Sequence, residues 1–160
     1  VYQQLTGKVA GIIFNRLLDL FPEKRFPTPQ SILSISIERL RSVGLSNQKA
    51  QYIRNIAQAS IDGIVPDSRM ANRMTDQQLV NQLTSIKGVG RWTVEMLLIF
   101  RLGRPDILPV TDYGIQKGFA VVKRLEEHPK PKELIVAGEY WSPYRTVATW
   151  YLWRAAETVN

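Results

Sequence analysis

The apolar residues of this chain recur mainly at the three- and four-residue spacing that is typical of amphipathic helices. The first 21 residues show this pattern clearly, with apolar side chains at Leu5, Val9, Ile12, Ile13, Leu17 and Leu20. The spacing predicts one helix over residues 1–21, which Pro22 would end, because proline has no amide hydrogen with which to continue a helix. No segment of useful length alternates apolar and polar side chains, as a half-buried strand would. The sequence therefore predicts an all-α protein.

Capping residues and prolines divide the rest of the chain into further predicted helices. Thr28, Ser46 and Thr75 each precede a helical pattern, in the position where a hydroxyl group caps free amide groups. The further helices predicted in this way cover residues 28–35, 36–43, 47–62, 74–86, 91–102, 112–122, 133–141 and 142–159. We expect a loop at 64–73 and an irregular linker with two prolines at 103–110. The pattern thus predicts about nine helices.

Both ends of the chain have the pattern of a helix. Ser142 as a cap and Pro143 at the first helical position predict where the last helix begins. At the other end the chain starts without Met inside a helical pattern, so we expect that further residues precede Val1. The linkers around residues 22–29 and 63–74 are too short to isolate a domain, and we expect residues 1–160 to form a single domain. Within it, residues 1–21 could still pack with the C-terminal helices in a second lobe.

Composition and charge narrow the class of protein. Apolar residues make up 44% of the 160 residues, and no run of 18 apolar residues occurs, so neither a membrane span nor a membrane partner is expected. Cysteine is absent and His128 is the only histidine, which excludes iron–sulfur clusters and thiolate zinc sites; we expect no metal and no cofactor. Lys and Arg total 21 against 14 acidic residues, a formal net charge of +7. Such an excess indicates an anionic partner, nucleic acid first, although a merely basic soluble protein remains the alternative.

Two of the predicted helices are joined by the short turn KGVG, at residues 87–90, within the helix–turn–helix segment 83–102. Glycine permits a positive φ and lets another backbone come close. Free amide groups at the start of the second helix attract phosphate, and basic residues flank the turn. The candidate contacts to a nucleic-acid backbone are Lys87, Gly88, Val89, Gly90, Arg91 and Thr93. Such a clamp would bind without sequence preference, and an ordinary helix corner remains the alternative interpretation.

Five stretches of the chain together resemble a known protein family. They are VYQQLTGKVA, VGLSNQKAQYI, GVGRWTVEMLLIF, LPVTDYGIQKGF and WSPYRTVATWYLWRAAE, and they span nearly the whole chain. In this order they resemble the helix–hairpin–helix DNA glycosylase superfamily, and within it the 3-methyladenine DNA glycosylase II type. The resemblance implies an all-α fold of two lobes with a cleft between them. It also implies excision of alkylated purines, such as 3-methyladenine and 7-methylguanine, in base excision repair.

Asp112 matches the catalytic aspartate of that superfamily. Such enzymes flip a nucleotide out of the duplex and into a pocket. Alkylation at N3 or N7 leaves the purine positively charged and weakens its glycosidic bond, so the leaving base needs no protonation. A carboxylate near the sugar would stabilise the positive charge that develops there, while water attacks. The alternative is that Asp112 only caps the following helix, and the two roles are compatible.

Trp92 bears on both the chemistry and the base pocket. Superfamily members that also cut the DNA backbone carry a lysine at this position, which forms a Schiff base with the sugar. Because tryptophan cannot do this, the resemblance implies a monofunctional enzyme. Trp92, Met96 and Trp153 would line the base pocket, since electron-rich groups attract a cationic base. Core packing is the alternative for Trp92 and Trp153, and it is the favoured interpretation of Trp150.

Two further residues have candidate roles. The flipped base leaves a gap in the duplex, and the superfamily fills it from the region that matches Gln3, Gln4 and Leu5. We predict that Gln4 is the filling residue; a buried glutamine that caps backbone groups is the alternative. Arg145, near the start of the last helix, is predicted to form a structural ion pair.

The main hypothesis is thus a monofunctional alkylbase DNA glycosylase. The alternative is a glycosylase-like protein that binds damaged or abasic DNA without excising a base. A helix–hairpin–helix scaffold for another DNA enzyme is a third reading, against which the combination of Trp92 and Asp112 argues. The predicted partner is double-stranded DNA that contains alkylated bases or abasic sites, bound by a monomer. We expect an intracellular protein, in the nucleus of a eukaryote or the cytoplasm of a bacterium.

Overall fold

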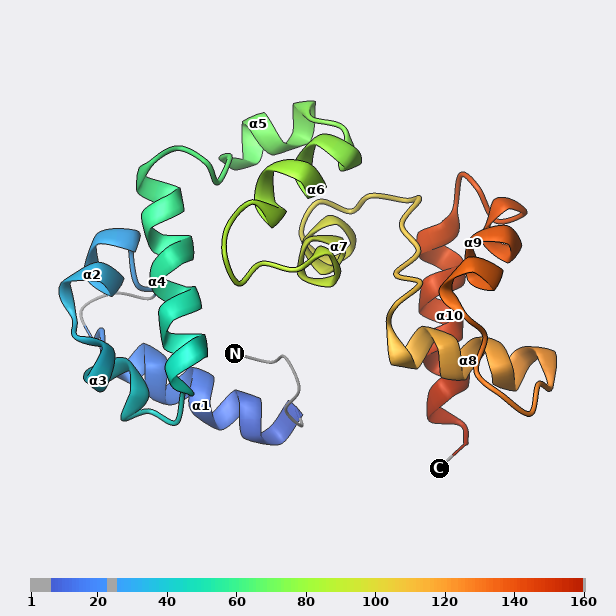
Figure 1. Cartoon of the computed structure of the whole chain (residues 1–160), viewed down its shortest axis with the longest axis horizontal. Helices are drawn as coiled ribbons and strands as arrows, with labels where there is room; N and C mark the ends of the chain where they lie inside the picture. Colours follow the sequence, from blue (N-terminus) through green and yellow to red (C-terminus); the bar gives the residue numbers. More distant parts are fainter. Residues whose placement is uncertain (1–6, 23–25, 160) are drawn as a thin grey trace. The chain divides into compact units, whose positions relative to one another are not determined.

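The computed structural model describes residues 7–22 and 26–159, and the regular structure of these residues is entirely helical (Figure 1). The helices are α1 (Gly7–Asp19), α2 (Pro29–Ser34), α3 (Ile37–Arg41), α4 (Asn47–Ile61), α5 (Ser68–Arg73), α6 (Asp76–Thr84), α7 (Arg91–Phe100), α8 (Tyr113–Lys123), α9 (Pro131–Glu139) and α10 (Arg145–Glu157). The predicted all-α fold is confirmed, with ten helices in the described residues where about nine were expected. Within the same residues, no helix has the length and apolar character that crossing a membrane requires.

The chain divides into two compact units, Val1–Val89 and Gly90–Asn160. The first contains α1 to α6 and the second α7 to α10, so the boundary falls inside the KGVG turn. All four tryptophans of the sequence lie in the second unit. A single functional domain that includes both units stays a prediction.

The core of the first unit forms where α2 and α3 pack against α4 and α1 contributes one apolar face. On α1 the buried positions are Ala10, Ile13 and Leu17, whereas Val9 and Ile12 are exposed. The helical period was therefore predicted correctly, but the apolar face is narrower than the sequence indicated. On α4 the core positions include Ala50 and Ala57, whose small side chains leave room for the neighbouring helices.

The stretch that we expected to be a loop, residues 64–73, contains the short helix α5. Asp67 caps it, and its side chain accepts a hydrogen bond from the amide of Met70 at 2.7 Å. Ala71 is the buried residue of this helix. With six residues and a single buried position, α5 is too short for a periodic pattern to be recognised, so its capping residue was the usable signal.

The last helix begins at Arg145 and not at Pro143 as predicted. Its first amide groups find acceptors in the preceding linker: Arg145 donates to Asp106 Oδ1 at 3.1 Å, and Thr146 donates to the carbonyl oxygen of Pro105 at 2.9 Å. The capping groups thus come from residues about 40 positions earlier. A pattern of neighbouring residues could not reveal them.

In the second unit α10 packs across α8 (Figure 1). Ile115 and Phe119 of α8 form a buried cluster with Leu134 of α9 and Leu152 of α10. A Cβ atom on Gly118 would overlap the backbone carbonyl of Leu152, so only glycine permits this approach. The close crossing matters for function, because it brings α10 to the start of α8, where Asp112 lies.

Candidate active site

Asp112 joins the linker to α8 and caps the helix. Its amide donates to the carbonyl oxygen of Pro109 at 2.9 Å, which turns the chain into the helix. Its Oδ1 accepts a hydrogen bond from the amide of Ile115 at 3.0 Å. Gln116 completes the corner, since its side-chain amide donates to the carbonyl oxygen of Val110 at 3.0 Å. The predicted capping role of Asp112 is therefore confirmed.

The same carboxylate accepts hydrogen bonds from two indole groups. Trp92 Nε1 on α7 donates to Asp112 Oδ2 at 2.6 Å, and Trp153 Nε1 on α10 donates to Oδ1 at 3.0 Å. Three helices of the second unit thus hold one half-buried carboxylate, and its partners within the described residues are neutral N–H groups. Neutral donors orient the carboxylate without cancelling its charge, so the charge remains available to a cation brought close to it.

Two glycines on one face of α8 make this arrangement possible. A Cβ atom on Gly114 would lie 3.0 Å from Trp153 Cδ1 and 3.1 Å from Asp112 Oδ1, closer than side chains normally pack. Gly118, one turn later, allows the backbone of α10 to approach. Sequence reasoning missed both glycines as site-forming residues. The available signal was their spacing of four within a helical segment, because glycine inside a helix is otherwise unfavourable.

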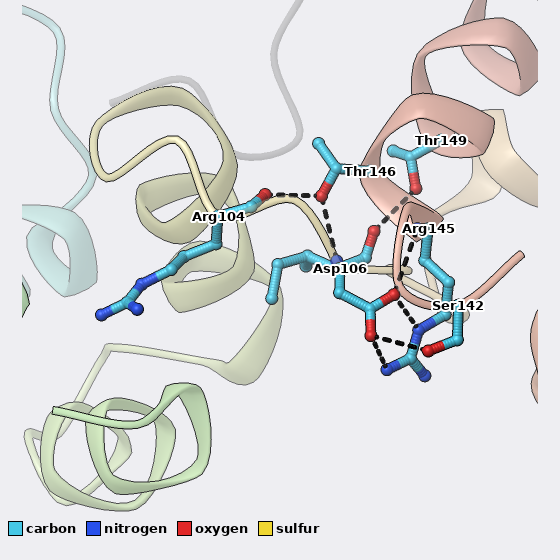
Figure 2. Close-up of polar contacts among 7 residues, drawn as sticks. Arg104, Asp106, Ser142, Arg145, Thr146 and Thr149 are labelled. Atoms are coloured by element: carbon cyan, nitrogen blue, oxygen red, sulfur yellow. Dashed lines mark hydrogen bonds and ion pairs between the residues drawn. The ribbon is translucent and has the colours of Figure 1, made fainter.

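The linker that leads to Asp112 is fixed on α10 by hydroxyl groups (Figure 2). Thr146 Oγ1 donates to the carbonyl oxygen of Arg104 at 2.7 Å and accepts from the amide of Ile107 at 3.0 Å. Thr149 Oγ1 donates to the carbonyl oxygen of Ile107 at 3.0 Å. Both threonines and Ile107 are buried, so the bonds to Ile107 satisfy backbone groups that lie away from water. An irregular linker is in this way held in a defined path.

Asp106 in the same linker forms a bidentate ion pair with Arg145 (Figure 2). Arg145 Nε and Nη2 donate to Oδ1 and Oδ2, each at 2.7 Å, and Ser142 Oγ donates to Oδ2 at 3.1 Å. The hydrogen bond from Arg145 is the main cause that lowers the pKa of Asp106 from 3.8 to about 2. The structural ion pair predicted for Arg145 is confirmed, and Asp106 is its partner.

An exposed aromatic cluster lies next to the carboxylate. The ring of Phe100 on α7 stacks on Trp153, with centroids 5.8 Å apart and an angle of 11° between the planes. Trp150 packs in a T-shaped arrangement against both rings, with its centroid 5.3 Å from that of Phe100 and 5.9 Å from that of Trp153. Phe100 is 58% and Trp150 49% exposed, so the core packing favoured for Trp150 is wrong. Trp92, Met96 and Trp153 are half-buried.

The two glycines of the KGVG turn differ in their surroundings. Gly88 has φ +103°, and a Cβ atom there would overlap the ring of Tyr52 on α4. Asn55 of the same helix donates from its side-chain amide to the carbonyl oxygen of Lys87 at 3.0 Å. Gly90 has φ −87° and open space around the position of a Cβ atom, and it precedes α7 without a side-chain cap. The turn is thus braced at its first glycine and open at its second.

The remaining predicted site residues lie as follows. Lys87 and Arg91 are exposed, whereas Val89 and Thr93 are half-buried. Gln4 lies outside the described residues. No group of three or more metal-ligating side chains is placed to hold a metal ion in residues 7–22 and 26–159.

Comparison with known proteins places these features in a family. Residues 1–143 match the model of the HhH-GPD superfamily base excision DNA repair proteins. DNA-3-methyladenine glycosylase 1 of Schizosaccharomyces pombe is 41% identical over 99% of this chain and 69% of that protein. An alkylbase DNA glycosidase-like protein of the same yeast is 34% identical over 95% of this chain and 72% of that protein.

Two solved structures agree with this assignment. One is the 3-methyladenine DNA glycosylase of S. pombe in complex with abasic DNA, which is 41% identical, with a TM-score of 0.91 over 97% of this chain and 75% of that one. The other is a DNA-3-methyladenine glycosidase of Bacillus halodurans, 37% identical, with a TM-score of 0.85 over 98% of this chain and 71% of that one. The resemblance inferred from five sequence segments is confirmed: the chain belongs to the HhH-GPD superfamily of base excision DNA repair proteins.

Proposed function

We propose that this protein is a monofunctional DNA glycosylase that removes alkylated purines, of the 3-methyladenine and 7-methylguanine class, by hydrolysis. The observation that carries the proposal is the carboxylate of Asp112, which neutral N–H groups from three helices hold in place. Relatives named as 3-methyladenine glycosylases support the substrate class. An enzyme with this function would be located with the DNA, in the nucleus of a eukaryote or the cytoplasm of a bacterium.

Asp112 acts in this mechanism by stabilising positive charge on the sugar. As the C1′–N bond of the flipped nucleotide breaks, its electron pair leaves with the base, and the cationic base becomes neutral. The sugar becomes cationic at that moment, and a fixed negative charge beside it lowers the barrier. Water then forms the new bond to C1′ and loses a proton to the carboxylate or to solvent. The products are a free base and an abasic site.

The base pocket is assigned to the aromatic groups around Asp112. Trp92 and Trp153 orient the carboxylate through their N–H groups, and their ring faces suit an electron-poor purine. Met96 lies one turn along α7 from Trp92 and would contact the same base. Phe100, stacked on Trp153, extends this aromatic surface.

Double-stranded DNA is the proposed partner, bound by a monomer. The exposed part of the KGVG turn, with Lys87 and Arg91, would hold a backbone phosphate without reading the sequence. Gln4 is proposed to fill the gap that the flipped base leaves. The residues 1–160 would act together as one glycosylase domain.

The decisive experiment compares Asp112→Asn with the wild type in single-turnover release of 3-methyladenine and 7-methylguanine. The asparagine carbonyl can still accept from Ile115 and Trp153, so the cap survives, but the negative charge is lost and the amide nitrogen that replaces Oδ2 can no longer accept from Trp92 Nε1. Removal of a comparable electrostatic group slows a reaction by about 10² to 10³. Affinity for a duplex with an abasic site should persist. Asp67→Asn is the matched control, since Asp67 also caps a helix.

The same experiment tests the alternative function, which is binding of damaged or abasic DNA without excision. The alternative would be favoured if the wild type holds abasic DNA tightly and releases neither base. Equal excision rates for the wild type and Asp112→Asn would instead reduce Asp112 to a helix cap.

A further inference from the structure

Glu95 on α7 is a buried carboxylate that the proposed chemistry does not use. Its Oε1 accepts a hydrogen bond from Arg91 Nε at 2.9 Å, one turn earlier on the same helix. Its Oε2 is buried and has no hydrogen-bond partner among the residues that the structure describes. The two side chains differ sharply in exposure, at 62% for Arg91 and 6% for Glu95.

Stability does not account for this pair. Burial raises the pKa of Glu95, although the hydrogen bond and charge of Arg91 lower it, and the charge of Asp112 adds a smaller increase. An ionised carboxylate with one oxygen lacking a partner is therefore held at a cost in free energy. A pair with one buried member is in general weak evidence for stability, because desolvation offsets the attraction. Such costs are often retained at functional sites.

The geometry instead favours a role in orienting Arg91. A guanidinium group has five N–H donors in one plane, and Glu95 engages only the Nε hydrogen. The side chain is thereby anchored at one end, while most of it stays exposed in the first turn of α7, directly after Gly90. A planar donor group fixed in this manner matches a phosphate better than a freely moving one, since less conformational freedom is lost on binding.

We propose that Glu95 is a positioning residue that holds the guanidinium group of Arg91 in place for a DNA backbone phosphate. This inference rests on the proposed function, in which the KGVG turn and Arg91 contact DNA. It makes a prediction opposite in sign to simple electrostatics. Removing a negative charge should strengthen binding to a polyanion, whereas removing the anchor of Arg91 should weaken it.

The test measures affinity for an undamaged duplex as a function of salt concentration, after thermal melting shows that each variant is folded. Glu95→Met should bind more weakly than the wild type. The slope of log affinity against log salt concentration should become shallower by up to about 0.9, the value for one phosphate contact, as it should in Arg91→Ala. Glu95→Gln keeps a carbonyl acceptor for Arg91 Nε and should retain most of the affinity. In an Arg91→Ala background, Glu95→Met should cause no further loss. Glu157→Met, which breaks the exposed pair of Glu157 with Arg154, controls for the change in charge.

Arg91→Lys is a second variant that leaves the buried carboxylate untouched. It keeps the positive charge but lacks the planar group that Glu95 anchors. The positioning role therefore predicts weaker binding, whereas a role of charge alone predicts unchanged binding. Wild-type affinity in both Glu95→Met and Arg91→Lys, with weaker binding in Arg91→Ala, would overturn the inference and leave the phosphate contact standing. Unchanged binding in Arg91→Ala would remove both. Excision by the wild type, measured alongside, reports on the proposed function independently.

Discussion

At the scale of single residues, two aspartates of one linker are used in opposite ways. Asp106 is paired with a guanidinium group, so its charge is neutralised within the fold. Asp112 accepts hydrogen bonds from neutral groups of Trp92, Trp153 and Ile115, so its charge is oriented and kept. The difference in partners separates a structural carboxylate from a candidate catalytic one.

The pair of Asp106 and Arg145 predicts a pH-dependent contribution to stability. Because folding lowers the pKa of Asp106 to about 2, its contribution is present above the ordinary value of 3.8 and is lost as the pH falls toward 2. Asp106→Asn should therefore lower the free energy of unfolding at neutral pH by about 1–2 kcal/mol. This range is below the value that the full pKa shift would give, because solvent partly screens the ion pair.

Thermal melting of the wild type and Asp106→Asn between pH 7 and pH 2.5 checks this prediction. The difference in melting temperature should shrink as the solution becomes acidic. A difference that stays constant across that range would mean that the ion pair contributes nothing beyond the shape of the side chain.

Sequence reasoning reached part of this residue-scale picture. Asp112 and Trp92 were named as candidates because their positions match motifs, and the structure places Trp92 Nε1 2.6 Å from Asp112 Oδ2. Glu95 and Asp106 were missed as interacting residues. The partner of Asp106 lies 39 positions away, and no local pattern records it. The partner of Glu95 is one helical turn away, but the burial that makes this pair unusual arises only when helices pack.

At the scale of elements, the fold requires the first glycine of the KGVG turn but not the second. Gly88 is required by the fold of the first unit, because its φ is positive and the ring of Tyr52 occupies the space beside it. Gly90 has an ordinary φ and open space. A residue with a side chain can therefore occupy the second position and not the first.

This contrast predicts different phenotypes for two single substitutions. Gly88→Ala should destabilise the protein, by about 1 kcal/mol or more from the positive φ alone, with the overlap on Tyr52 adding to it. Gly90→Ala should fold normally, with at most a small cost at the cap position, and should weaken DNA binding if a phosphate approaches the backbone there. Melting temperature and duplex affinity distinguish the two. Equal melting temperatures for both variants would contradict the assignment of Gly88.

Elements with a repeating apolar face or a local cap were predictable, and others were not. α4 and α6 follow Ser46 and Thr75, as the sequence indicated. The start of α10 was displaced by two residues, because Asp106 and Pro105 supply acceptors from the linker. Local signals compete with tertiary ones at helix ends, and the tertiary signal prevailed here.

At the scale of the whole molecule, charge and family membership agree. A formal net charge of +7 is typical of a protein that binds DNA, and the chain belongs to a superfamily of base excision repair proteins. The proposal that the enzyme is monofunctional rests on the tryptophan at position 92, where the resemblance implies a lysine in members that also cut the DNA backbone. The tryptophan leaves no lysine there to attack the sugar.

We predict that the protein forms no covalent adduct with DNA when it processes an alkylated duplex in the presence of borohydride. Reduction traps a Schiff base, and a monofunctional enzyme does not form one in its reaction. Denaturing electrophoresis of labelled DNA gives the measurement, with a lysine-bearing superfamily member as the positive control. A trapped adduct that maps to a lysine near Asp112 would contradict monofunctionality.

The placement of every tryptophan in the second unit has a spectroscopic consequence. Excitation at the indole band reports on residues 90–160 alone, while far-ultraviolet dichroism reports on helices of both units. Comparing the two signals during denaturation would reveal whether the units unfold together or in sequence. Half of the indoles also donate to Asp112, so their emission should respond when a base enters beside that carboxylate. The protein thus carries an intrinsic fluorophore at its candidate active site, and base entry could be followed without any attached label.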